Sequence, residues 1–230
     1  TGEPIWPIEE REVPTDTDLE GEQPARSLMA KPRASIAVAA GLLKAGKANA
    51  IVSSGSTGGS MAACVLVLGL FPGLERPTVG GPFLALAPRT TIIDLGANVE
   101  CDADNLFQFG VMGSVFARTV LALLKPSVGL LNVGTEEMKG NDAVRQAATY
   151  LRESRMPIQY HGFVEGDDIA KGTVDVIVTD GFTGNVALKT IEGTVRLYSD
   201  FLHKAFKNSL ISGLGYLLAR HSLNKLRARL

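Results

Sequence analysis

The stretch Val178–Thr190, VTDGFTGNVALKT, passes from a buried strand to a helix through a short polar turn. It follows an apolar run that begins at Val174, and short β-branched runs of this kind are typical of buried strands. Asp180 and Gly181 then interrupt the run, and the residues after Gly184 have a helical pattern. A strand that leads through a glycine turn into a helix is typical of a βα unit.

Similar junctions occur at three earlier places, in ANAIVSSGSTGG, RTTIIDLGANVECD and PSVGLLNVGTEEMKGND. We expect helices at 35–47, across SMAACVLVLGL, from about 104 to 124, and from 143 to 153. Strands that alternate with helices favour a mostly parallel sheet with helices on both faces. The sequence therefore predicts an α/β fold.

Composition narrows the class of protein. The chain has 230 residues, 45% of them hydrophobic, and 23 basic against 24 acidic residues give a net charge of -1. This is the profile of a soluble globular protein, and its charge gives no reason to expect a nucleic-acid partner. Cys64 and Cys101 lie far apart with no CxxC pair. That argues against a disulfide scaffold or a zinc site and fits a reducing cytoplasm.

Three segments are expected along the chain. Residues 1–33 are polar and proline-rich and predict a loop or linker, residues 34–195 predict an α/β catalytic domain, and residues 196–230 predict a basic amphipathic helical segment. No apolar run reaches the roughly 18 residues of a membrane-spanning helix. The chain begins at Thr1 rather than Met, and we expect both ends to be incomplete.

The four polar loops are candidate ligand sites. In open α/β sheets, ligands bind beyond the carboxyl ends of the strands, and glycine-rich turns before helices present N–H groups to anions such as phosphate. Turns between strands and helices use the same residue types without binding anything, so that reading stays open. The candidate phosphate or substrate ligands are Ser54, Gly55, Ser56, Thr57, Gly58, Asp94, Asn98, Gly134, Thr135, Asp180, Gly181, Thr183 and Gly184.

Motifs for other chemistries are missing from the sequence. It contains no GxGxxG or GxxxxGK[ST] nucleotide fingerprint and no GxSxG elbow. The three histidines lie outside all four loops, which disfavours a triad with a histidine base. We predict no metal site and no cofactor.

SSGSTGGSM, DLGANVECD, GLLNVGTEEMKGND and VTDGFTGNVALKTIEG, in this order and spacing, resemble the PlsX family of bacterial phosphate acyltransferases. The resemblance implies a fold similar to the isopropylmalate-dehydrogenase and phosphotransacetylase group, and a homodimer. It also implies transfer of a fatty acyl group from acyl carrier protein to inorganic phosphate. The acyl phosphate would then pass to a membrane glycerol-3-phosphate acyltransferase for phospholipid synthesis.

Two departures from the family pattern stand out. The AVDAMGGD-like opening strand and the HGSS-like closing segment of the family are absent, and the usual GNTGA loop reads GSTGG, with Ser56 in place of asparagine.

Two residues are candidates for catalysis. Phosphate must attack a thioester carbonyl, which requires cations and N–H donors that hold the phosphate and the developing oxyanion. Lys139 is the one lysine inside the four loops, and Asn185 offers an amide near a helix start. The resemblance points to both positions as catalytic. Without it, Lys139 reads as a solvated loop lysine and Asn185 as a helix N-cap.

The C-terminal segment carries a separate signal. Its apolar residues fall on helical faces, with a break expected near Ser212-Gly213, and the candidates for membrane or partner contact are Leu210, Leu214, Leu217 and Leu218. The segment is also rich in lysine and arginine, which favours an anionic membrane or an acidic partner such as acyl carrier protein. The alternative is a helix in a dimer interface. We therefore expect a cytoplasmic protein that touches the membrane peripherally, as the resemblance also implies.

Acyl transfer from carrier protein to phosphate is the leading hypothesis. A phosphotransacetylase-like enzyme that uses coenzyme A and short acyl groups is the first alternative. A non-catalytic protein that binds a phosphoryl ligand or docks on a membrane is the second. A nicotinamide dehydrogenase is disfavoured because the dinucleotide fingerprint is missing.

Overall fold

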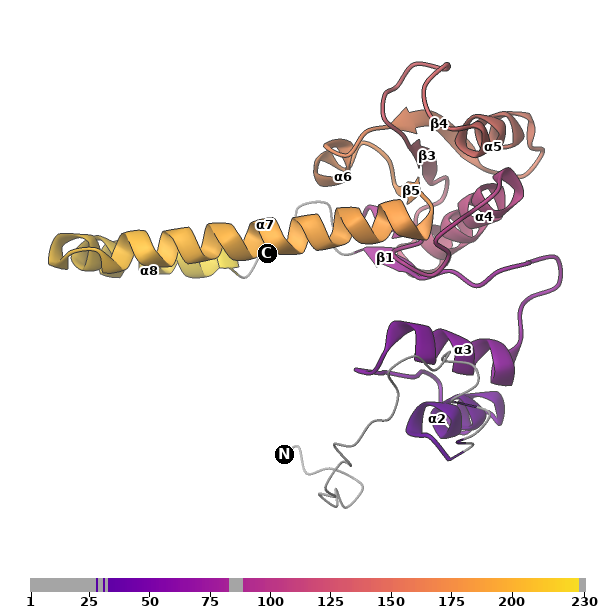
Figure 1. The fold of residues 1–230 in the computed structure, drawn as a ribbon, viewed down its shortest axis with the longest axis horizontal. Helices are drawn as coiled ribbons and strands as arrows, with labels where there is room; N and C mark the ends of the chain where they lie inside the picture. Colours follow the sequence, from indigo (N-terminus) through magenta and orange to yellow (C-terminus); the bar gives the residue numbers. More distant parts are fainter. Residues whose placement is uncertain (1–27, 29–30, 32, 83–88, 228–230) are drawn as a thin grey trace. The chain divides into compact units, whose positions relative to one another are not determined.

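The computed structural model describes residues 28, 31, 33–82 and 89–227 (Figure 1). The chain forms two compact units, Thr1–Gly69 and Leu70–Leu230. Most of the predicted linker at 1–33 lies outside the described residues, and the predicted domain boundaries stay a prediction. The described residues contain seven helices and five strands.

The first unit is a helix pair. Helix α2 (Ser35–Lys44) packs on α3 (Thr57–Leu68), with the small side chains of Ala40 and Ala63 fully buried between them. The ammonium of Lys44 donates to the carbonyl oxygen of Val67 at 2.6 Å. Small residues at the contact let the two helices approach closely, which is how so short a segment forms a core.

The strand expected in ANAIV is wrong. Residues 48–56 have no regular structure, and the side chain of Val52 is 98% exposed. The apolar run there is only Ile51-Val52, and the described part of this unit offers no second strand to pair with it. An unpaired strand leaves its backbone groups unsatisfied, so the chain runs as a loop into α3.

The second unit is built on a mixed sheet. Its strands are β1 (Gly80–Pro82), β2 (Thr91–Ile93), β3 (Ser127–Leu131), β4 (Gln159–Val164) and β5 (Val176–Val178). Their order is β1-β2-β5-β3-β4; β1 pairs antiparallel with β2, and the other pairs are parallel. The predicted α/β fold with a mostly parallel sheet is therefore confirmed.

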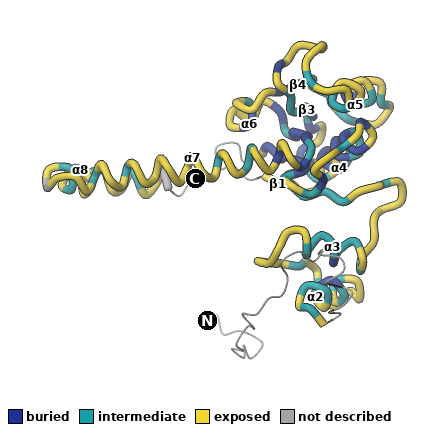
Figure 2. The backbone as a smooth tube through the Cα atoms, viewed as in Figure 1, coloured by how far each residue is buried: buried dark blue, intermediate teal, exposed yellow. Residues whose placement is uncertain are grey.

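Alternation along the strands places an apolar cluster on each face of the sheet. In β5, Val176 and Val178 belong to one cluster and Ile177 to the other. Helices α4 (Ala103–Val120) and α5 (Asp142–Glu153) contribute to the first. Helix α6 (Asp168–Lys171) and the first turns of α7 (Gly181–Lys207) contribute to the second. Helices thus cover both faces, as predicted, and Figure 2 shows the buried residues along the strands and α4.

A helical hairpin extends from the sheet. Only the start of α7 packs on the apolar cluster; most of the rest is exposed (Figure 2), and α8 (Leu210–Arg227) folds back beside it (Figure 1). The two helices separate at Asn208-Ser209, four residues before the expected break, and the Ser209 hydroxyl accepts from the Ser212 N–H at 3.1 Å. Serine is a good N-cap, so the second helix starts there and runs through Gly213. No helix in the described ranges is long and apolar enough to span a bilayer.

Candidate functional site

Three of the four predicted loops leave the same edge of the sheet. Strands β2, β5 and β3 are neighbours and run parallel, so their carboxyl ends at Ile93, Val178 and Leu131 lie side by side. They lead into the 94–101 loop, the start of α7, and the 132–141 loop. This edge is where α/β sheets bind their ligands.

Asp94 organises the 94–101 loop from inside. It is fully buried with a positive φ of 73°. Its carboxylate accepts from the N–H groups of Gly96 (3.1 Å), Ala97 (2.6 Å) and Asn98 (3.0 Å) and from the Asn98 side-chain amide (2.7 Å). A buried carboxylate requires such donors. The Asp94 carboxylate therefore holds the shape of the loop through these N–H groups.

Two glycines bring α7 against this loop. The N–H of Gly181 donates to the carbonyl oxygen of Asn98 at 2.7 Å. A Cβ at Gly184 would lie 1.9 Å from the carbonyl oxygen of Asp94, and one at Gly181 would lie 2.8 Å from the backbone of Asn98. Only glycine permits this approach. The DGFTG motif thus joins two strand ends that are far apart in the sequence.

Asp180 is the N-cap of α7. Its two carboxylate oxygens accept from the N–H and the hydroxyl of Thr183, each at 2.8 Å. Asn185 lies within the helix, exposed, with its side chain next to Gly96. The alternative that Asn185 caps the helix is therefore wrong, because Asp180 has that role. The Asn185 amide sits at the junction of α7 and the 94–101 loop.

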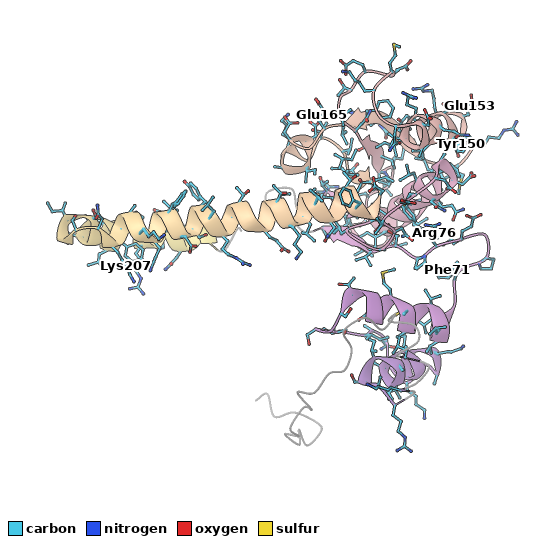
Figure 3. The ribbon with its side chains drawn as sticks, viewed as in Figure 1. Phe71, Arg76, Tyr150, Glu153, Glu165 and Lys207 are labelled. Atoms are coloured by element: carbon cyan, nitrogen blue, oxygen red, sulfur yellow. The ribbon has the colours of Figure 1, made fainter. Side chains whose placement is uncertain are left out.

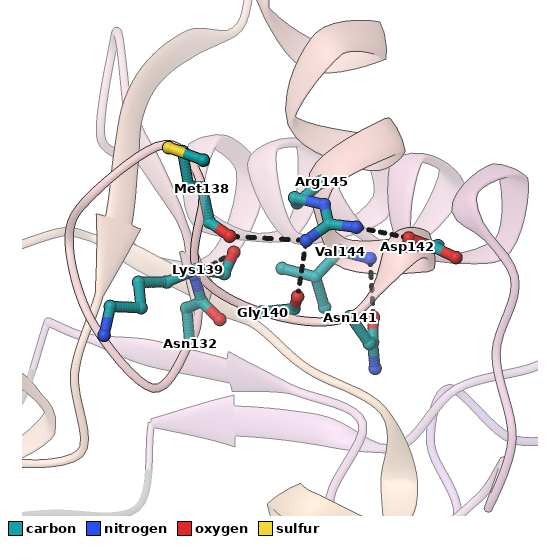
Figure 4. A network of polar contacts seen from close by, with 8 residues as sticks. All are labelled: Asn132, Met138, Lys139, Gly140, Asn141, Asp142, Val144 and Arg145. Atoms are coloured by element: carbon teal, nitrogen blue, oxygen red, sulfur yellow. Dashed lines mark hydrogen bonds and ion pairs between the residues drawn. The ribbon is translucent and has the colours of Figure 1, made fainter.

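Asn132 closes the 132–141 loop (Figure 4). Its side-chain amide donates to the carbonyl oxygens of Gly134 and Lys139, each at 3.1 Å. Arg145 from α5 donates to the carbonyl oxygens of Met138 (3.3 Å) and Gly140 (3.1 Å) and pairs with Asp142. With the backbone held from both sides, the loop presents Lys139 from a fixed turn.

The Lys139 side chain lies along Gly134. It points away from Arg145, as Figure 4 shows. Among the described residues its ammonium has no ion-pair or hydrogen-bond partner, whereas Arg145 is paired with Asp142. The backbone N–H groups of Gly134 and Thr135 likewise have no recorded acceptor within the described ranges. A cation and open N–H donors in one turn can bind an anion.

A cavity of about 410 Å³ lies where the three loops meet. Its polar lining comes from Glu100 in the first loop, Asn141 at the start of α5, and Asp180 and Thr183 at the start of α7. Arg76 supports this rim from outside by donating to the carbonyl oxygen of Glu100 at 2.9 Å; Figure 3 labels it. The volume falls within the range of small-molecule sites.

Cys101 lines this cavity, and its thiol carries no charge at neutral pH. Burial, followed by the negative charges of Asp94 and Asp180, raises the pKa of its thiol from 9.0 to about 11. Its sulfur lies 3.5 Å from the carbonyl oxygen of Asn98. Nucleophilic cysteines have lowered pKa values, so this thiol is not set up to attack a substrate.

The fourth loop lies in the first unit, at the start of α3. Ser56 is the N-cap and accepts from the N–H of Gly59 at 3.4 Å, so Thr57 and Gly58 form the first turn of the helix. Ser54, Gly55 and Ser56 line a cavity of about 780 Å³ that also includes Lys31. Residues 45–53, which lead into this loop, form no strand, so the expectation that all four loops follow strands of one sheet is wrong. A shared site with the other three loops stays a prediction.

The C-terminal candidates lie on α8. Leu214, Leu217 and Leu218 are all exposed, the last by 82%, whereas the side chain of Leu210 lies outside the described residues. A groove of about 850 Å³ runs between the two helices. The ring centroids of Phe206 and Tyr216, which both line it, lie 5.5 Å apart. Apolar side chains thus face solvent on the hairpin.

A family model described as "Fatty acid synthesis protein" matches residues 12–230. The chain belongs to this family. It is 54% identical over 207 residues to a "Phosphate acyltransferase" of Paramagnetospirillum magneticum, covering 90% of this chain and 59% of the relative. A protein of the same name from Rhodospirillum centenum is also 54% identical, with 90% and 58% covered. The one from Parvibaculum lavamentivorans is 47% identical, with 95% and 61% covered.

The chain therefore spans about three fifths of the length of these curated relatives. The resemblance to the PlsX family drawn from the four motifs is confirmed.

Two residues of the candidate site were missed in the sequence. Asn132 follows β3 directly and Arg145 lies four residues after the α5 cap, Asn141. The signal for Asn132 was its place at a strand end before a glycine, where side-chain amides close turns. For metals, the described residues contain no group of three or more histidine, cysteine or acidic side chains.

Proposed function

We propose that this protein transfers a fatty acyl group from acyl carrier protein to inorganic phosphate and releases acyl phosphate for phospholipid synthesis. One observation carries the proposal. In a member of the fatty acid synthesis protein family, three loops from adjacent parallel strands surround one cavity, and Lys139 and open N–H groups stand on one of them. The name phosphate acyltransferase, printed for the relatives, supports the same reaction.

The reaction needs little beyond positioning and charge. A phosphate oxygen attacks the thioester carbonyl carbon, the C–S bond breaks, and the carrier thiolate leaves and takes up a proton. Phosphate is already ionised at neutral pH, so no strong base is required. The protein must hold an anion against a carbonyl and stabilise the tetrahedral oxyanion, which is the task of preorganised donors.

In this proposal Lys139 and Asn185 are the catalytic residues. The Lys139 ammonium and the N–H groups of Gly134 and Thr135 bind the phosphate, and the Asn185 amide stabilises the oxyanion. Asp94, Asn98, Asp180, Gly181, Thr183 and Gly184 build the platform by fixing α7 against the 94–101 loop. Ser54, Gly55, Ser56, Thr57 and Gly58 remain proposed phosphate or substrate ligands of the first unit.

The partners follow from the substrate and the hairpin. Acyl carrier protein delivers the acyl group. The protein forms a homodimer and touches an anionic membrane. The exposed apolar and basic side chains on α7 and α8 make these contacts in the proposal. The product, a reactive mixed anhydride with a long apolar chain, is taken up by a membrane glycerol-3-phosphate acyltransferase.

The test is release of carrier-protein thiol from a long-chain acyl-carrier substrate with and without phosphate, using the protein at its full natural length. The proposal expects release that requires phosphate. Coenzyme A thioesters of short acids, run in parallel, separate the reaction from a phosphotransacetylase-like one. No turnover of either donor would leave only a binding role.

A further inference from the structure

The cavity at the sheet edge has an apolar wall as well as its polar rim. Besides its polar residues, it is lined by carbon-rich side chains from three segments of the chain. These side chains are Val99, Leu106, Ala143, Val144 and Phe182. An anion site alone does not need such a wall, so the wall calls for its own explanation.

Two of these side chains bury little of their apolar surface in the folded protein. Phe182 is 62% exposed and Val99 is 65% exposed, although their chain neighbours Thr183 and Asn98 are held by hydrogen bonds to Asp180 and Asp94. Large exposed apolar side chains that rim a polar site mark a place where apolar surface binds. Leu106, which is 2% exposed, also lines the cavity, so a ligand there meets buried apolar surface beside the polar groups.

Cys101 completes this wall as an uncharged group. Its thiol is held neutral by burial and by two nearby carboxylates, and a neutral thiol packs like a small apolar side chain. A thiolate in the same place would compete with phosphate for the acyl group. The wall is therefore inert toward a thioester as well as apolar.

The size of the cavity sets a limit on its occupant. A cavity of 150 Å³ holds one benzene, so about 410 Å³ has room for roughly sixteen carbon atoms. Two polar residues of the cavity lining, Asn141 and Thr183, lie two residues along the chain from Lys139 and Asn185, respectively. An occupant with a polar reactive head and an apolar body of limited length matches both the polar and the apolar lining.

We propose that this cavity holds the part of the acyl chain next to the thioester carbonyl, and that Val144 and Phe182 set the chain length accepted. Val144 projects from the first turn of α5 and Phe182 from the first turn of α7, so the two stand on separate helices at the cavity. This inference rests on the proposed acyl transfer. It adds the residues that determine which acyl chain lengths the protein accepts.

The test is the ratio of kcat/KM for long-chain and short-chain acyl-carrier donors in two variants of the full-length protein. Val144→Phe fills the cavity, and the ratio should fall about tenfold or more. Phe182→Ala removes an apolar contact, and KM for the long-chain donor should rise about tenfold, as loss of one large apolar contact predicts. Val120→Phe is the matched control, because Val120 is exposed at the end of α4, outside the cavity, and its ratio should not change.

The outcomes separate the two claims. Ratios in Val144→Phe and Phe182→Ala that match the control, in an active enzyme, would overturn the chain-length role and leave acyl transfer standing. No phosphate-dependent transfer by the unmodified protein with any chain length would overturn the proposed function and this inference with it. If Val144→Phe does not fold, Phe182→Ala decides alone, because its side chain is mostly exposed and its loss leaves the core intact.

Discussion

At the scale of single residues, the site depends on which polar groups are already used. The carboxylate of Asp94 accepts from three N–H groups of its own loop, and that of Asp180 accepts from the N–H of Thr183 in the first turn of its helix. Lys139 and the N–H groups of Gly134 and Thr135 are left with no recorded partner in the described part of the chain. In the proposed reaction, the 132–141 loop therefore supplies the donors for phosphate, and the Asn185 amide on α7 supplies the donor for the oxyanion.

Lys139→Ala should lower kcat for acyl transfer by about 10²-fold or more, because a preorganised charge at an oxyanion is worth that much. Asn185→Ala should have an effect of similar size. Lys125→Ala is the matched control, since this lysine lies just before β3, at the opposite edge of the sheet, and its rate should not change. Steady-state kinetics on variants with unchanged circular dichroism measure the effect. Near-normal rates for both site variants would return them to structural roles.

Cys101 gives a pH-dependent prediction. In a Cys64→Ser background, alkylation by iodoacetamide at pH 9.5 should be about tenfold slower, or more, in the folded protein than in urea, because only thiolate reacts and folding raises the thiol pKa from 9.0 to about 11. Since the folded state holds this proton more tightly, the stability it contributes is present below pH 9 and is lost as pH rises toward 11. Equal rates in the two states would contradict the burial of this thiol.

At the scale of elements, the contact between α7 and the 94–101 loop holds the site together. Gly184→Ala should lower the free energy of unfolding by about 3 kcal/mol, because its Cβ would overlap a backbone carbonyl that cannot rotate away. Gly193→Ala, in the same helix with nothing within 4 Å of the new Cβ, should instead raise it by up to about 1 kcal/mol. Urea denaturation measures both. Changes of the same sign would show that this close contact does not form.

Elements were predictable where local sequence determines them. The run before Asp180 and the glycines after it predict a strand, a turn and a helix, and the structure has β5 and α7 there. Ile51-Val52 has the same local character but has no strand partner among the described residues of its unit, and pairing is not a local property. The strand order β2-β5-β3 could not be predicted from the sequence either. Pairing between distant strands depends on the packing of the whole sheet.

The residues of the candidate site were predictable from the sequence, but the hydrogen bonds and the cavity that join them were not. Lys139, Asp180 and Gly184 stand in motifs whose residue types suggest anion binding. The bonds from Asn132 and Arg145 end on backbone carbonyls whose positions exist only once the loop has folded. The cavity itself brings together residues from three distant segments, which no single motif contains.

At the scale of the whole molecule, the hairpin of α7 and α8 carries apolar and basic surface away from the sheet edge. It includes Lys207 at the end of α7, labelled in Figure 3, and the exposed leucines of α8. An acyl phosphate with a long chain is poorly suited to diffuse through water. A surface that lies on the membrane would keep synthesis and use of the product close together.

Leu214→Glu and Leu217→Glu should weaken binding to vesicles of anionic lipid at every salt concentration, because they remove apolar contact. Binding of the unmodified protein should weaken as salt rises, since the lysines and arginines are screened. Val120→Glu, on an exposed site of α4, should bind as the unmodified protein does. Vesicle sedimentation with sizing of the oligomer measures this. Intact dimers of both leucine variants that bind vesicles normally would exclude the membrane role, and dissociation would favour a dimer interface.

The most direct test of acyl transfer to phosphate is the identity of the product. Phosphorus NMR can follow inorganic phosphate and a long-chain acyl-carrier thioester in the presence of the full-length protein. The account predicts one acyl phosphate, seen by NMR, for each carrier thiol released, counted with a thiol reagent. In Lys139→Ala, formation of acyl phosphate and release of thiol should be lost together. Release of thiol with free fatty acid and no acyl phosphate, under conditions where acyl phosphate itself is stable, would mean hydrolysis and would contradict the account.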